Sequence, residues 1–176
     1  MTKWNISPRS YGEYNENNLN NVYGEIRDCD LLNIAESLPI VVERFLDVGS
    51  GCGGPLIYLA EHGGIVYACG IENNKYRYEK SNVLLSQKTE DIQQKVEFIE
   101  DTFENHSFVP YDVVYCCNTM FNEPQNTKLV QKCLNECTNL FILMTLESSC
   151  LQYYWKCVKV NTSWKDNVNV FIYKKP

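Results

Sequence analysis

The residues of this chain best suited to chemistry form one short stretch, an acid followed by closely spaced glycines: Asp47-Val-Gly-Ser-Gly-Cys-Gly53. A strand pattern precedes the glycines and a helical pattern follows them, which predicts a strand-to-helix turn. Without Cβ atoms, glycines let the backbone turn tightly and approach a ligand closely. A second acid, Glu72, ends the next expected strand, where a carboxylate can accept hydrogen bonds from both hydroxyls of a ribose. These residues predict a site for a nucleoside-containing ligand.

Two classes of cofactor fit the glycine spacing. The glycines also satisfy Gly-x-Gly-x-x-Gly, so a nicotinamide or flavin enzyme is one alternative, with a pyrophosphate at the helix N-terminus. Asp47 lies two positions before the first glycine, where a carboxylate can take the amino group of an amino-acid-like ligand. Asp47 and a C-terminal hairpin on a short chain favour S-adenosylmethionine (SAM). The residues expected to bind it are Asp47, Gly49, Ser50, Gly51, Gly53 and Glu72.

The elements that must position these residues alternate along the chain. Helical spacing is found at 26–38, 55–62, 75–94 and 124–136, and strand patterns at 44–48, 65–71, 96–100, 111–117 and 140–146. Two further strand patterns, 155–160 and 168–174, flank turn residues and predict an antiparallel hairpin. This order predicts an α/β, Rossmann-like class I methyltransferase fold: a mostly parallel seven-stranded sheet ending in that hairpin, with helices on both faces. We expect residues 1–21 to form an irregular arm and 22–176 the SAM-binding domain.

Composition narrows the class of protein further. The chain has 176 residues, nine cysteines and a net charge of −6. It shows no secretory signal pattern and no long apolar run, so we expect an intracellular protein, cytoplasmic or nuclear, with reduced thiols and without a membrane span. The charge does not support broad binding to nucleic acid. Two short basic stretches, 75–80 and Lys174-Lys175, are the candidates for a local basic patch. No cysteine or histidine spacing indicates a metal site.

The loop after the expected fourth strand holds two further candidates. Asn118 is placed to orient an acceptor amine or a nearby water, or alternatively to bond its own backbone as a turn residue. Cys116 and Cys117 suggest a covalent nucleophile, but without a preceding proline motif we interpret them as buried strand-end thiols. The loop is not Asn/Asp-Pro-Pro-Tyr/Phe, so methylation of a base amino group is not indicated.

From residue 23 to the C-terminus, the sequence resembles the Dot1-like (disruptor of telomeric silencing) histone lysine methyltransferases. The motifs that carry the resemblance are Tyr23-Gly-Glu25, the glycine loop, Glu72, Glu100-Asp-Thr-Phe103, Cys117-Asn-Thr-Met-Phe121 and Ser163-Trp164. The resemblance implies SAM as cofactor and a protein lysine, on a histone or another protein, as methyl acceptor. It also implies roles for single residues. Tyr23 and Glu25 would close the cofactor site, Phe103 with Asp101 or Thr102 would contact adenine, Asn118 would lie beside the methyl group, and Trp164 would line the lysine channel.

The sequence also departs from this family. Phe171, seven residues after Trp164, stands where the family has an active-site tyrosine, so the ring is kept and the hydroxyl is lost. Cys117 replaces an asparagine, and the basic extension that grips nucleosomes is missing. These departures keep three alternatives open. They are a catalytically silent relative that binds SAM or a partner, a methyltransferase for another protein, and a methyltransferase for a small molecule.

Overall fold

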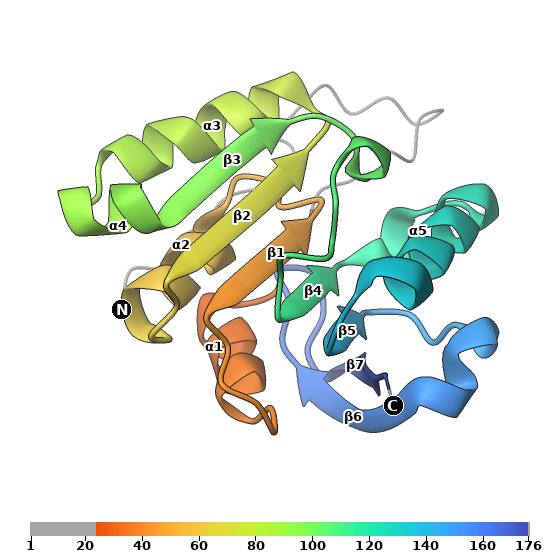
Figure 1. Cartoon of the computed structure of the whole chain (residues 1–176). Helices are drawn as coiled ribbons and strands as arrows, with labels where there is room; N and C mark the ends of the chain where they lie inside the picture. The colour runs from red at the N-terminus through yellow and green to blue at the C-terminus, as the bar shows by residue number, and fades with distance from the viewer. Residues whose placement is uncertain (1–23, 176) are drawn as a thin grey trace.

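The computed structural model describes residues 24–175, so the expected arm and Tyr23 lie outside the described residues. The elements follow in the order α1 (Asp28–Glu36), β1 (Arg44–Val48), α2 (Gly54–His62), β2 (Tyr67–Glu72), α3 (Lys75–Ser86), α4 (Glu90–Lys95), β3 (Val96–Glu100), η3 (Phe103–Asn105), β4 (Val113–Cys116), η4 (Asn118–Met120), α5 (Glu123–Glu136), β5 (Leu140–Leu143), η5 (Ser148–Tyr153), β6 (Tyr154–Val160) and β7 (Val168–Lys174) (Figure 1). Strands and helices alternate as the sequence predicts.

The seven strands form one sheet in the order β3-β2-β1-β4-β5-β7-β6. The five strands β3, β2, β1, β4 and β5 run parallel, and β7 is antiparallel to both β5 and β6. The predicted sheet and its terminal hairpin are therefore confirmed. Strand order reverses between β1 and β4, the point where open α/β sheets hold their ligands.

Helices cover both faces of the sheet, as expected (Figure 1). The first four helices pack on one face, where Leu31 of α1 and Leu56 of α2 meet strand residues such as Phe45. Helix α5 covers the other face, where Leu129 packs with Phe141 and other apolar residues. The parallel strands are buried on both sides, which explains their continuous apolar runs.

The glycine loop joins β1 to α2 in a conformation that requires glycine. Gly53 has a φ of +78°, and a Cβ atom there would lie 2.2 Å from the Phe98 ring. Positive φ values also occur at Gly49 and Gly51. The backbone N–H groups of Gly49 and Ser50 donate to the Ile71 carbonyl at 2.8 and 3.1 Å, which fixes the loop against β2.

One predicted element is wrong. The single helix expected at 75–94 is two helices, α3 and α4, because Thr89 adopts an extended conformation and starts the second helix. The Gln93 side chain donates to the Lys88 carbonyl at 2.7 Å, within the break. The break turns α4 so that Ile92 joins the same apolar cluster as Leu85 of α3. The predicted strand 111–117 is shorter at both ends, and the predicted strand 140–146 is shorter at its carboxyl end, where the chain leaves the sheet. Among residues 24–175, no helix is long and apolar enough to span a membrane.

Candidate functional site

A cavity of about 370 Å³ opens at the carboxyl ends of the parallel strands, around the point where strand order reverses. Its size falls in the range of about 300–1,000 Å³ usual for small-molecule sites. Residues from the ends of β1, β2 and β4 form its floor, and the segment after β3 forms one wall. Glu25 and Trp164 approach it from opposite ends of the chain.

Asp47 ends β1 at the floor of this cavity, and it is 4% exposed. No hydrogen bond or ion pair to its carboxyl occurs among the described residues. Burial, and then the nearby Glu72 carboxylate, raise the pKa of Asp47 to about 8. A buried acid without a partner is costly to ionise, and a cationic group in the cavity would relieve that cost.

Glu72 is held in one orientation by backbone donors. The N–H of Gly51 donates to Oε2 at 2.9 Å, and the N–H of Asn74 donates to Oε1 at 2.8 Å. The Arg77 guanidinium lies 3.8 Å from Oε1. Each carboxylate oxygen accepts more than one hydrogen bond. Glu72 is therefore positioned in advance, with acceptor capacity left for a ligand that carries two adjacent hydroxyls.

Glu25 lies above Asp47 in the segment that precedes α1. Burial, followed by Asp28 and Asp47, raises the pKa of Glu25 to about 8. Burial also raises the pKa of Asp28, the next acid along the chain, which does not itself line the cavity. Glu25 and Asp47 thus share one poorly solvated part of the cavity.

The segment around Glu25 is clamped by the loop between β6 and β7. The N–H of Ser163 donates to the Glu25 carbonyl at 2.8 Å, and the Glu25 N–H donates to Ser163 Oγ at 3.1 Å. The Trp164 ring lies against Gly24, where a Cβ atom would be 2.2 Å from the ring. Glycine is required at this position because Trp164 occupies the space of a side chain. Gly24-Glu25 and Ser163-Trp164, distant in sequence, therefore meet over the cavity.

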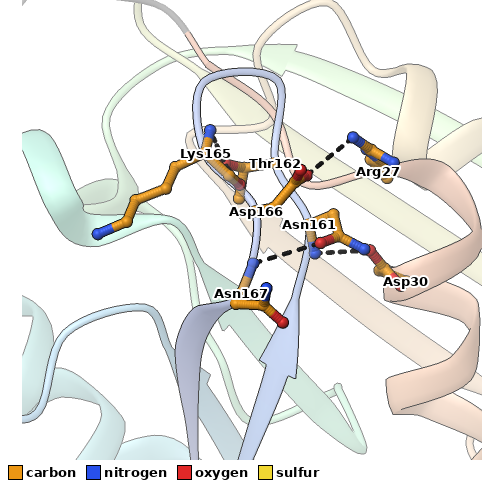
Figure 2. Close-up of polar contacts among 7 residues, drawn as sticks. All are labelled: Arg27, Asp30, Asn161, Thr162, Lys165, Asp166 and Asn167. Carbon is orange, nitrogen blue, oxygen red and sulfur yellow. Dashed lines mark hydrogen bonds and ion pairs between the residues drawn. The ribbon is translucent and has the colours of Figure 1, made fainter.

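Further polar contacts extend this clamp (Figure 2). The Asn161 N–H donates to Asp30 Oδ2 at 2.7 Å, which ties the end of β6 to α1. Arg27 pairs with Asp166 at 2.9 Å, and both side chains are largely exposed. Exposed pairs contribute little on their own, about 0–1 kcal/mol. The backbone and Asp30 contacts are therefore the main constraint on where Glu25 and Trp164 lie.

The three residues expected near adenine all line the cavity wall after β3: Asp101, Thr102 and Phe103. The Phe103 and Phe121 rings stack with centroids 6.1 Å apart. Hydrogen bonds from Thr102 N–H, Asn105 and His106 lower the pKa of Asp101, so it is an acceptor that is already partly used.

Two residues expected in the site lie elsewhere. Asn118 is fully buried and does not line the cavity. Its Nδ2 donates to Asn126 and Thr145, and its Oδ1 accepts from the N–H groups of Met144 and Thr145 at 3.0 Å. Both donors and both acceptors of the amide are thus used in joining the loop to the end of β5. These contacts favour the alternative interpretation, in which Asn118 has a structural role, and its role beside the reacting groups stays a prediction.

Phe171 is the second residue that the fold keeps out of the cavity. Phe171 lies on β7 and pairs with Leu143 of β5. Its ring centroid is 6.0 Å from that of Tyr154, on the face of the sheet covered by α5. Trp164 lies in the hairpin loop rather than on a strand, so the two residues do not share a face. Strand alternation fixes this outcome, because successive residues of β7 point to opposite faces and Phe171 points to the face covered by α5.

Tyr115 was not among the site residues predicted from the sequence. It lies beside Asp47 in the register of β1 and β4, is 2% exposed, and lines the cavity. Its hydroxyl has no hydrogen-bond partner among the described residues, and the same is true of Ser50 Oγ. Burial raises the pKa of Tyr115 well above its usual value, so the phenol stays neutral. Only the pairing of β1 with β4 brings it next to Asp47, and this pairing is not visible in the sequence.

Cys117 also lines the cavity, whereas Cys116 is buried in the core on the other face. Burial raises the pKa of Cys117 to about 11, and it raises the pKa of Cys116 well above its usual value. Neutral thiols are poor nucleophiles, so neither cysteine is prepared for covalent chemistry. Within residues 24–175, no group of three or more metal-ligating side chains is placed to hold a metal ion.

No known family model matches the sequence, and no curated protein matches it. Solved structures match the fold. An RNA methyltransferase from Salinibacter ruber, in complex with S-adenosyl-L-homocysteine, is 18% identical with a TM-score of 0.66, and the match covers 85% of this chain and 90% of that one. Magnesium protoporphyrin IX methyltransferase (ChlM) from Synechocystis PCC 6803, with bound SAM, is 13% identical with a TM-score of 0.65, covering 96% and 88%.

The plantazolicin methyltransferase BpumL, in complex with SAH, is 19% identical with a TM-score of 0.52. That match covers 65% of this chain but only 44% of the BpumL chain. The three neighbours are class I methyltransferases with different acceptors. The chain has the class I methyltransferase fold. At these identities the likeness concerns the fold alone. The function of this chain must therefore be inferred from the residues of the cavity.

Proposed function

We propose that this chain is a SAM-dependent methyltransferase. The observation that carries the proposal is the buried Asp47, whose carboxyl has no partner among residues 24–175, beside the pre-oriented Glu72 in a cavity where strand order reverses. A dinucleotide would bring a pyrophosphate to the start of α2, where these acids would repel it. An ammonium group and a ribose suit the same residues.

Different residues of the cavity would bind different parts of the cofactor. Asp47 would hold the ammonium group, together with the adjacent Tyr115 hydroxyl, which has no partner in the part of the chain that the structure describes. Glu72 would accept from the ribose hydroxyls, and Phe103 with Asp101 or Thr102 would contact adenine. When bound, SAM supplies a methyl group on a sulfonium. The protein must align an incoming nucleophile with that methyl group and exclude water.

We further propose that the acceptor is an amine, specifically the side chain of a protein lysine, with histones as the first candidates. The described cavity lining contains five acids and one base, Arg77, which suits a cationic acceptor. Trp164 offers an aromatic surface, and aromatic faces attract ammonium groups. The contact between Gly24 and Trp164 also supports the resemblance to the Dot1-like family, since it joins two of the motifs that carry it.

Glu25 is the residue suited to remove the proton from such an amine. Glu25 and Trp164 both line the cavity, and a pKa of about 8 is close to the value that suits a general base near neutral pH. The amine must be neutral to attack. In an acidic, poorly solvated cavity, transfer of its proton to the Glu25 carboxylate would supply the neutral form.

Two measurements test the proposal in sequence. Calorimetry with SAM, S-adenosylhomocysteine and NAD determines the cofactor, and NAD binding without SAM binding would refute the assignment. Labelled SAM is then incubated with histones, octamers and lysine-rich proteins, with Glu25→Gln as the matched variant. We expect label on lysine with the wild-type protein and strongly reduced label with E25Q. If only RNA or a small amine were labelled, the assignment of SAM as cofactor would stand and the proposed lysine acceptor would be wrong.

Two observations favour a second candidate, a catalytically silent protein that binds SAM. Asn118 has no hydrogen-bonding capacity left for a substrate, and Phe171 lies away from the cavity. Both residues depart from active-site roles that the resemblance implies. Formation of S-adenosylhomocysteine with any acceptor would exclude this candidate. SAM binding without turnover across the acceptor panel would favour it over the first.

A further inference from the structure

A second surface, remote from the cavity, combines aromatic rings with lysines. A shallow depression at the β6–β7 hairpin is lined by Tyr153, Tyr154, Trp155, Lys174 and neighbouring residues. Tyr154 is 42% exposed and Trp155 41%, unusual for rings of this size. Lys174 pairs with Leu140 at the start of β5. The depression thus lies at the opposite edge of the sheet from Trp164, about 20 Å away along β7.

The charge of this surface is opposite to that of the chain. Lys174 and Lys175 line the depression, and no acid is among the described residues that line it, whereas the whole chain has a net charge of −6. The Lys156 ammonium lies 5.8 Å from the centre of the Trp155 ring. Lys175 donates to the Leu134 carbonyl at 2.6 Å, which fixes its charge beside the depression. The basic stretch at the C-terminus therefore joins residues of β6 to form a patch, as the sequence alone could not show.

The backbone of β6 indicates what kind of partner the surface accepts. β6 is an edge strand, and such edges often receive another strand. Here a register shift between Tyr154 and Lys156 interrupts the pairing of β6, and Lys156 itself is exposed. Irregularities and edge lysines both oppose strand addition. A second copy of this chain or an extended peptide pairing along β6 is therefore disfavoured, and recognition must use the side chains.

We propose that this surface binds single-stranded nucleic acid, with bases stacked on Tyr154 and Trp155 and phosphates beside Lys156 and Lys174. Exposed rings stack on any base, and adjacent lysines neutralise the backbone. The proposal does not rest on the function of the cavity. The net charge opposes binding over the whole molecule, so the interaction is confined to the hairpin and is sensitive to salt.

Fluorescence anisotropy with a labelled oligouridylate of about twelve nucleotides tests the proposal. Trp155→Ala should weaken binding by a factor between about 5 and about 150, because a base loses its stacking partner. The double variant Lys156→Glu/Lys174→Glu keeps every ring. It should weaken binding and make the slope of log affinity against log salt shallower by about 1.4, the value for two phosphate contacts to a single strand. Thermal melts confirm that each variant is folded.

Two matched controls separate this surface from general effects. Trp164→Ala removes a ring of similar exposure, 45%, at the other end of the hairpin. Lys80→Glu reverses a charge on α3, where Lys80 lies 5.3 Å from the Tyr76 ring. Both should leave oligonucleotide binding unchanged. The proposal is overturned if the wild-type protein fails to bind at low salt, if either control weakens binding as much as W155A, or if duplexes bind as well as single strands. Binding of polyglutamate in place of the oligonucleotide also overturns it.

Discussion

Binding of the cofactor should release protons, because the empty cavity holds two acids that are protonated at neutral pH. The pKa values of Glu25 and Asp47 are both raised to about 8, chiefly by burial. At pH 7, a group with a pKa of 8 is about nine-tenths protonated. A ligand ammonium beside these carboxyls favours their charged forms, so each ionises as the ligand binds.

The magnitude follows from linkage. If one ammonium ionises one of the two acids fully, about 0.9 protons leave per ligand at pH 7, and ionisation of both would double this number. Affinity for SAM should then rise about tenfold for each pH unit between about 6 and 7, and level off above about 8. The dependence weakens there because the acids are already ionised in the empty protein.

Isothermal titration calorimetry in buffers of different ionisation enthalpy counts these protons directly. Glu25→Gln and Asp47→Asn are the matched variants, and titration of the ligand's own amino group cancels when they are compared with wild type at the same pH. Each variant should release fewer protons. Equal heats in every buffer at pH 7 would show that both acids are ionised before the ligand arrives, and would refute the reasoning.

Four further predictions concern single residues. Between about pH 4 and pH 8, Asp47 binds more protons in the folded protein than in the unfolded chain, so the free energy of unfolding falls as pH rises. Asp47→Asn removes this effect. It should therefore raise the melting temperature of the ligand-free protein at pH 8, and it should weaken SAM binding. Asn118→Ala leaves the buried N–H groups of the chain after β5 without their acceptor, and should cost about 3 kcal/mol in urea unfolding; an unchanged midpoint would contradict its structural role. Tyr115→Phe should raise the unfolding midpoint in urea, because it removes a buried hydroxyl that has no partner among the described residues, and should weaken SAM binding about three- to tenfold by calorimetry. Gly24→Ala forces the Trp164 ring aside and should destabilise the protein by about 1–3 kcal/mol; a midpoint equal to wild type would show that the clamp yields without cost.

The sequence predicted the framework of the molecule well, because local signals determine it. Strand patterns ending in the acids Asp47 and Glu72 placed both at the edge of the sheet where the cavity opens. Turn residues between two strand patterns predicted the closing hairpin. The break near Thr89 was missed because the apolar spacing continues across it. A change of helix direction there depends on which cluster the next apolar residue joins.

By itself, the sequence determined the fold class, the glycine loop and the pair of acids that flank it, since each depends on periodicity or on residues close together in the chain. Tertiary structure decided which candidate residues share the cavity. Strand pairing brings Tyr115 beside Asp47, whereas the hydrogen bonds of Asn118 direct its amide into the core. The clamp that joins Gly24 to Trp164 forms across the length of the chain. Such contacts depend on strand order and packing, and neither can be predicted from the spacing of residues close together in the chain.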